Sequence, residues 1–194
     1  MIRTARRDEL IKQMVSNTEA FVEKVMRMDC ILNQKIEPMP DTRIWQPFAE
    51  VHIWTHGTSV NVFEVVGTGH PDYAGITWIE MLIRGKRMPV NLPLLQNNPD
   101  YYFSRETIEP PITYLSLNDK TYIHYDGNHR TAIAKALYYF LGKREIGLVE
   151  WHRYFVDFQT IDLVKHIQKR LGSISPALRI TPENRTKTRQ DAPG

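Results

Sequence analysis

Apolar side chains recur at helical spacing in three separate parts of the chain. The first spans about residues 5–29 and contains Leu10, Ile11, Met14, Val15, Phe21, Val22, Val25 and Met26. This spacing predicts one long amphipathic helix, whose apolar stripe packs in the core or, alternatively, binds a partner. The other two predict helices over about 129–141, which Gly142 ends, and over about 161–171. A shorter apolar stretch predicts a helix over 76–83.

Runs rich in β-branched and aromatic residues predict the strands. They lie at residues 51–54, 60–66, 111–117, 121–125 and 146–156. A turn at 56–59 separates the first two, and the third and fourth form a hairpin around Asn118. Residues 84–103 contain several prolines and are expected to form a long loop.

The order of these elements favours a mixed α/β, or α+β, fold, because strands and helices alternate only in part. A length of 194 residues suits one compact domain. We expect residues 1–50 to be a helix and loop that pack on the core. Residues 51–175 form the domain itself, and 176–194 form a basic tail that is expected to be disordered.

Composition narrows the class of protein only slightly. A hydrophobic fraction of 42% and a charged fraction of 24% are ordinary for a globular protein, and a net charge of +3 permits a polyanionic partner without requiring one. Cys30 is the only cysteine, which excludes an intramolecular disulfide and a cysteine-rich zinc site. No apolar run is long enough to cross a bilayer, and the charged N-terminus lacks a secretory pattern. We therefore expect a cytoplasmic protein without membrane insertion.

The most informative motif is the turn between the hairpin and the second helix. It reads Asp126-Gly127-Asn128-His129-Arg130-Thr131. Asn128 is a favourable N-cap, which would leave the amides of 129–131 unpaired at the positive end of the helix dipole. Such an end binds anions. The alternative is a plain strand-to-helix connection, since Asp, Gly and Asn all favour turns.

The two basic residues of this motif favour the anion site. His129 and Arg130 stand where cations oppose the helix dipole, so the arrangement costs stability unless an anion lies between them. Arginine pairs with phosphate oxygens in a bidentate manner, and histidine can donate a hydrogen bond or relay a proton. The turn is therefore predicted to hold a phosphate.

Together with its surroundings, the motif resembles the core of the ParB/sulfiredoxin superfamily. The resemblance rests on Pro110-Pro111-Ile112, the hairpin, the box 126–130 and the alanine-rich helix behind it, and it covers roughly 108–151. It implies a single ParB/sulfiredoxin-like domain in which Gly127, Asn128, His129, Arg130 and Thr131 bind nucleotide or nucleic-acid phosphate. Asn128 replaces the catalytic cysteine of sulfiredoxins, and the chain after the last helix is too short for a helix-turn-helix domain.

Within the superfamily, the chain is most similar to the plasmid fertility-inhibition proteins of the Osa/FiwA type. That branch implies ATP hydrolysis and DNA cleavage directed against conjugative transfer. The implied catalytic residues are His129, Arg130, Asp126 and Glu109, with ATP and Mg²⁺ as cofactors and Asp126 as the metal ligand or as a brace for the turn. Glu109 and its neighbour Glu106 serve as a general base or metal ligand, or are surface glutamates.

Nucleic acid has a second candidate contact. Arg84, Lys86 and Arg87 form the densest cationic run of the folded part and would bind phosphates without reading bases, unless the run is a solvated loop. The aromatic run 101–103 either stacks on bases or belongs to the core.

Two other motifs are set aside. His124 and the following turn are similar to the box of Fic AMP-transferases, but the spacing of the histidine is wrong. His52, His56 and His70 lack the acidic cluster that would accompany a metal site.

The sequence thus predicts a nucleotide-binding phosphohydrolase, an ATPase and DNA nuclease. One alternative is a phosphotransferase that uses the same turn. The other is a non-enzymatic inhibitor that binds a conjugative coupling or type IV secretion protein through its N-terminal helix.

Overall fold

The computed structural model describes residues 2–102, 110–183 and 186–191. In this part of the chain, seven strands form one mixed sheet in the order β1-β3-β5-β4-β6-β2-β7. The strands are β1 (Glu37–Pro38), β2 (Ala49–Asn61), β3 (Val65–Thr68), β4 (Thr113–Leu117), β5 (Lys120–Ile123), β6 (Glu145–Val156) and β7 (Lys187–Asp191). The pairs β4–β5 and β2–β6 are antiparallel, and the remaining neighbours run parallel. The predicted mixed α/β class is confirmed.

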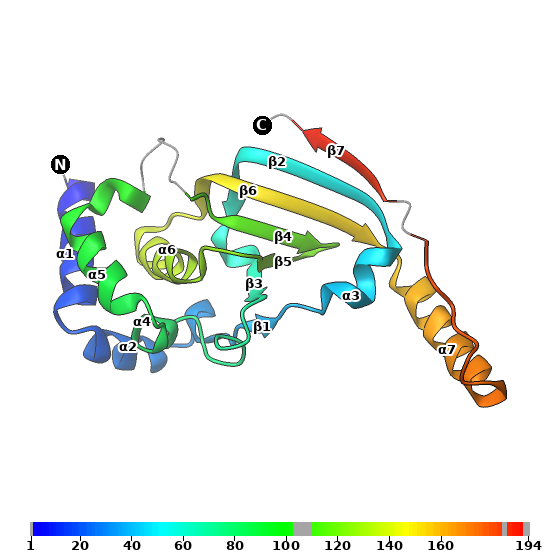
Figure 1. Cartoon of the computed structure of the whole chain (residues 1–194). Coiled ribbons are helices and arrows are strands. Elements are labelled where there is room, and N and C mark those ends of the chain that lie inside the picture. The colour runs from blue at the N-terminus through cyan, green and yellow to red at the C-terminus, as the bar shows by residue number, and fades with distance from the viewer. Residues whose placement is uncertain (1, 103–109, 184–185, 192–194) are drawn as a thin grey trace.

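Most helices gather around α6 at one end of the sheet, while α7 projects from the other end (Figure 1). The α-helices of the described residues are α1 (Ile2–Ser16), α2 (Thr18–Met26), α3 (Thr42–Trp45), α4 (Met81–Arg84), α5 (Met88–Asn97), α6 (Asn128–Leu141) and α7 (Phe158–Ile174). None of the helices in the described ranges has the length and apolarity needed to cross a bilayer.

The core lies on both faces of the sheet. The larger cluster fills the space between the sheet and the helices, and α6 contributes Ile133 and Leu137 to it. The smaller cluster lies on the other face, where Trp45 of α3 packs with Leu115 and Tyr122. The apolar stripe of the N-terminal helices is part of the larger cluster, because Ile11 and Met14 are fully buried in it. Most of that stripe therefore serves the core, although Met26 at its end is exposed.

The predicted N-terminal helix is two helices. Asn17 separates them, and its side-chain oxygen accepts a hydrogen bond from the amide of Ala20 at 3.0 Å. Asparagine is a strong N-cap, so α2 begins anew after this residue. The apolar periodicity continues across the break, which is why the pattern alone indicated one helix.

The predicted strands 51–54 and 60–66 are also rearranged. β2 runs without interruption from residue 49 to 61, because the strand continues through the expected turn with register shifts around Gly57, whose φ is +70°. A short 3-10 turn at Val62–Glu64 then separates β2 from β3. A glycine with positive φ inside a long strand is typical of a β-bulge, which bends a strand without ending it.

Three further predictions are wrong. The expected proline-rich loop contains α5, which begins with Pro89 in its first turn, where the missing amide hydrogen costs nothing. The expected helix 76–83 shrinks to the single turn of α4. In the tail, residues 187–191 are not disordered but form β7, which pairs in parallel with the edge of β2 (Figure 1).

The hairpin, α6 with its Gly142 end, β6 and α7 follow the sequence predictions closely. These elements have strong local signals. Gly142 has a φ of +68°, and Asn118 supports the hairpin turn with a φ of +52°.

A buried lysine anchors α6 to the sheet. Lys135 is 1% exposed, and its Nζ donates to the carbonyl of Val65 at 2.9 Å and lies 4.2 Å from the centre of the Trp78 ring. Burial lowers the pKa of this amine from 10.5 to about 7. The folded state therefore releases its proton more readily than the unfolded chain does.

This pKa difference makes stability depend on pH. Between about pH 7 and pH 10.5 the unfolded chain holds the proton that the folded state has lost, so the free energy of unfolding should rise with pH in this window. Substitution of Lys135→Met should flatten that rise, and Lys12→Met on the exposed face of α1 should leave it unchanged. Urea denaturation at several pH values measures both. Parallel curves for wild type and Lys135→Met would contradict the assignment.

Candidate functional site

The turn before α6 is shaped by Gly127. Its φ of +114° is rarely adopted by other residues, and a Cβ built there would lie 2.5 Å from Cγ2 of Ile112. Gly127, and not Asn128, is the N-cap residue of α6. The helix thus begins one residue earlier than predicted, and its first turn rests directly on the segment that enters β4.

Asn128 and Thr131 point into the protein. The side-chain oxygen of Asn128 accepts a hydrogen bond from the Thr68 hydroxyl at 2.6 Å, and the Thr131 hydroxyl lies 2.8 Å from the Tyr114 hydroxyl. Both side chains are buried. The amide of Thr131 donates to the carbonyl of Gly127 at 2.7 Å, which leaves the amides of 128–130 ahead of the first helical hydrogen bond.

Arg130 is a brace of the turn. Its side chain is 9% exposed, it donates from Nη1 to the carbonyl of Pro110 at 2.7 Å, and Nη2 lies 3.2 Å from Oδ2 of Asp126. The guanidinium therefore ties α6 to the segment before β4 and is already neutralised by a carboxylate. The sequence-based expectation of two basic side chains that both grip an anion is not met by Arg130 in this arrangement.

His129 lies between two groups from other segments. The amide of Arg87 donates to its Nε2 at 3.2 Å, and the Tyr73 hydroxyl lies 3.3 Å from the same atom. Burial, followed by the positive charge of Arg87, lowers the pKa of His129. The ring is therefore neutral at neutral pH, and because Nε2 accepts, its proton resides on Nδ1.

These groups surround a cavity of about 430 Å³ at the N-terminal end of α6. Its walls come from α5, from the segment before β4 and from the turn itself. The lining residues are Arg87, Val90, Asn91, Pro110, Asp126, Gly127, His129 and Arg130. The cavity therefore lies at the first turn of α6 and is lined by one neutral histidine and two arginines.

Arg87 is the cation of this cavity that can meet a ligand. It is exposed, it precedes α5, and no acidic side chain pairs with it within the described residues. Its two predicted companions are occupied, since Lys86 pairs with Asp72 and Nη1 of Arg84 lies 3.6 Å from Oε1 of Glu80. Of the three cations predicted to contact nucleic acid, Arg87 is thus the one without an acidic partner among the described residues.

Asp126 has little capacity left for a metal ion. Its Oδ1 accepts from the amide of Gly127 at 2.6 Å, and Oδ2 pairs with Arg130. The described ranges contain no group of three histidine, cysteine, aspartate or glutamate side chains that could hold a metal. Asp126 is the one carboxylate that lines the cavity within the described residues, and its role as a metal ligand stays a prediction.

Four other predicted residues are not part of the described cavity lining. Glu106, Glu109 and Phe103 are outside the described residues. Tyr102 belongs to the core, where its carbonyl accepts from the Tyr138 hydroxyl at 2.6 Å.

The histidines considered for a metal site are dispersed. Nε2 of His52 lies 3.0 Å from Nδ1 of His152 on the sheet, whereas His70 stacks on Tyr73 with ring centres 4.5 Å apart.

Sequence reasoning did not find Val90 and Asn91 of this cavity. They lie on α5, which the proline content had indicated to be a loop. The only signal for them was the proline at residue 89, because proline is favoured at the first positions of helices.

No protein-family model, no curated protein and no solved structure matches this chain. The resemblance to the ParB/sulfiredoxin superfamily therefore remains a prediction from the motif and its surroundings.

The close approach of Gly127 to Ile112 can be tested with a matched pair of variants. Gly127→Ala should destabilise the fold strongly, because it combines a strained φ with a clash. Gly142→Ala should cost only the strain, about 1–3 kcal/mol, because a Cβ there meets nothing within 4 Å. Chemical denaturation gives both free energies of unfolding. Equal losses would show that the contact with Ile112 is unimportant.

Proposed function

We propose that the cavity at the N-terminal end of α6 binds the phosphates of a nucleoside triphosphate such as ATP, and that the protein hydrolyses phosphoesters there. One observation carries the proposal. The first turn of α6, the exposed guanidinium of Arg87, which has no acidic partner among the described residues, and the neutral imidazole of His129 meet at a single cavity.

Each of these groups has a use in binding a phosphate. Amides at the start of a 14-residue helix offer hydrogen bonds directed along the helix axis, at the positive end of its dipole. Arg87 offers a mobile, planar fork that matches phosphate oxygens. Arg130 contributes by holding the turn in place through its bonds to Pro110 and Asp126.

His129 is the candidate for moving a proton. Its neutral ring holds the proton on Nδ1, so this atom can donate to a phosphate oxygen while Nε2 stays bonded to the Arg87 amide. Mg²⁺ is expected to arrive bound to the triphosphate, because both carboxylate oxygens of Asp126 already have partners. The chain's own groups would act by positioning the phosphate and by neutralising its negative charge.

The proposal extends to DNA cleavage and to inhibition of conjugative transfer, on the strength of the motif resemblance. Among the described residues that line this cavity, Arg87 is the side chain expected to contact a DNA backbone. The alternative of an inhibitor that grips a coupling or secretion protein through the apolar stripe of the N-terminal helix is disfavoured, because that stripe is buried. A phosphotransferase would use the same cavity, and its product would be a phosphorylated acceptor instead of free phosphate.

Binding can be tested on adjacent residues. Arg87→Ala should weaken ATP binding about tenfold or more, because it removes a charge-assisted hydrogen bond to phosphate. Lys86→Ala, which removes a neighbouring cation already paired with Asp72, should change the affinity little. Isothermal titration calorimetry measures both, and thermal denaturation checks that the variants remain folded. Equal affinities for wild type and Arg87→Ala would exclude this cavity as the phosphate site.

Turnover is tested separately. His129→Gln keeps an acceptor for the Arg87 amide but cannot relay a proton as imidazole does, so phosphate release from ATP should fall by about 10²-fold or more with binding retained. Free phosphate is measured by a colorimetric assay, and cleavage of plasmid and single-stranded DNA is followed on gels. Full activity of the variant would remove His129 from the mechanism, and absence of any phosphate release from wild type would leave a binding domain.

A further inference from the structure

A second cavity, of about 380 Å³, opens at the same turn but shares no lining residue with the first. His124 and Tyr125 contribute to it, whereas the next two residues, Asp126 and Gly127, face the phosphate cavity. Its lining residues are Met39, Thr42, Trp45, Gln46, Gly69, Leu115, His124, Tyr125 and Tyr154. Its size falls in the range of small-molecule sites, roughly 300–1,000 Å³.

Among the described residues, none that lines this cavity carries a charged side chain. The lining contains no lysine, arginine, aspartate or glutamate. His124 is neutral as well, since burial lowers its pKa to about 4. A charged group would lose its hydration here without gaining a partner. The ligand part that fits is therefore uncharged.

Aromatic rings dominate this lining, and neighbours hold Tyr154 in place. Tyr154 stacks on His52 with ring centres 4.2 Å apart and an interplanar angle of 2°, and it meets the edge of Trp45 at 5.0 Å. His52 is in turn 3.0 Å from a ring nitrogen of His152. Tyr125 differs, because its side chain is largely in solvent with 78% of the residue exposed. The cavity thus has one ring that is held by neighbouring rings and one that is largely exposed to solvent.

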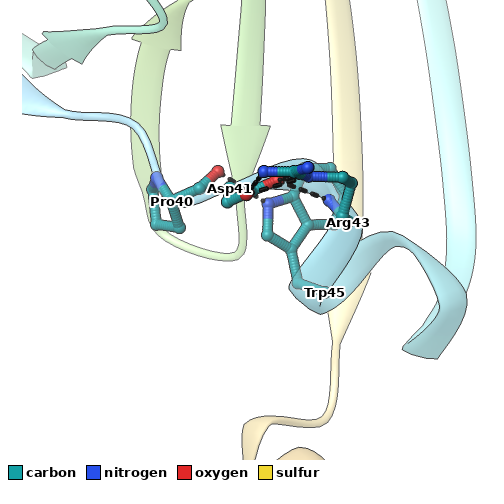
Figure 2. Close-up of polar contacts among 4 residues, drawn as sticks. All are labelled: Pro40, Asp41, Arg43 and Trp45. Carbon is teal, nitrogen blue, oxygen red and sulfur yellow. Dashed lines mark hydrogen bonds and ion pairs between the residues drawn. The ribbon is translucent and has the colours of Figure 1, made fainter. Parts of the chain in front are cut away.

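The opposite wall is the short helix α3, which is locked locally (Figure 2). The Asp41 carboxylate accepts from the Arg43 amide at 3.0 Å and also pairs with the Arg43 side chain. The indole of Trp45 donates to the carbonyl of Pro40 at 3.1 Å. This bracing places Thr42 and Gln46, both of which line the cavity and carry polar side chains, on a preformed wall.

His124 supplies an unused polar atom. Its Nδ1 is buried and has no hydrogen-bond partner. The ring of Tyr125 lies against the imidazole, with centres 3.7 Å apart. Buried polar atoms without partners are uncommon and costly, so a ligand group that reaches this nitrogen when Tyr125 moves would gain free energy.

We propose that this cavity binds one unpaired nucleobase, which stacks on Tyr125 and Tyr154 and forms hydrogen bonds with Gln46, Thr42 and His124. A nucleobase is planar and uncharged and carries donors and acceptors around its edge, which are the three properties that the lining selects. Its sugar and phosphate would remain outside. The base can belong to a free nucleotide or to single-stranded nucleic acid, and the site does not depend on hydrolysis at the other cavity.

The test uses probes that lack the triphosphate. The whole chain is titrated with adenosine, guanosine, cytidine and thymidine, and separately with a short single-stranded DNA of mixed sequence, by calorimetry. Saturable binding of a nucleoside identifies a free nucleotide as the source of the base, and binding of the oligonucleotide alone identifies a single strand. Either result supports the site, whereas no saturable binding by any probe overturns it.

Variants tie the signal to this cavity. Tyr125→Ala should weaken the binding by roughly 5- to 150-fold, the range found when a base-stacking aromatic is removed. Tyr125→Phe keeps the ring and should retain the affinity. Phe155→Ala is the matched control, since this exposed aromatic lies on β6 next to Tyr154 but outside the cavity lining. Unchanged affinity in Tyr125→Ala, or an equal loss in Phe155→Ala, overturns the proposal.

The two proposals fail in different ways. Adenosine has no phosphate, so Arg87→Ala should not alter its affinity, and a protein without ATP hydrolysis would still bind it. In the converse case, Arg87→Ala loses ATP binding while the wild type binds no nucleoside and no oligonucleotide. That result would support the phosphate site and contradict the base site.

Discussion

The contact between Gly127 and Ile112 decides where the first turn of α6 lies. No side chain fits between them, so the helix begins directly on the chain that enters β4. This close approach presents Asp126 and Gly127 to one cavity and His124 and Tyr125 to the other. A larger residue would lift the helix end from the sheet and alter both cavities together. The positive φ and the steric limit explain why a glycine stands at this point.

Polar side chains on α6 then fix its orientation. Each is buried and bonded to a different part of the sheet or to the chain leading into it. The pairs are Asn128 with Thr68, Thr131 with Tyr114, Lys135 with Val65, and Arg130 with Pro110. Each would cost free energy if left unpaired, so only one rotation of the helix satisfies them all. As a result, the N-terminal end of the helix is held in place beside the cavity that Arg87 and His129 line.

Strong local signals carried the successful part of the sequence-based prediction. The hairpin, α6 and β6 all have clear periodicity and turn residues, and their observed bounds are close to those expected. The failures occurred where two signals competed. At Gly57 a turn residue belongs to a bulged strand, and at Asn17 a cap interrupts an apolar stripe that continues beyond it. Periodicity records which side of an element is buried, but it does not record whether the element is interrupted.

The order of residues alone established a mixed fold and a turn of Asp, Gly, Asn, His, Arg and Thr at the start of a helix. It could not establish which cation remains available there. Packing assigned Arg130 to Asp126 and to a backbone carbonyl, and it brought Arg87 to the cavity at the start of a helix that had not been expected. The physical reason is that ion pairing and desolvation depend on which groups meet in space, and residues more than 40 positions apart in the chain meet only when the core has formed.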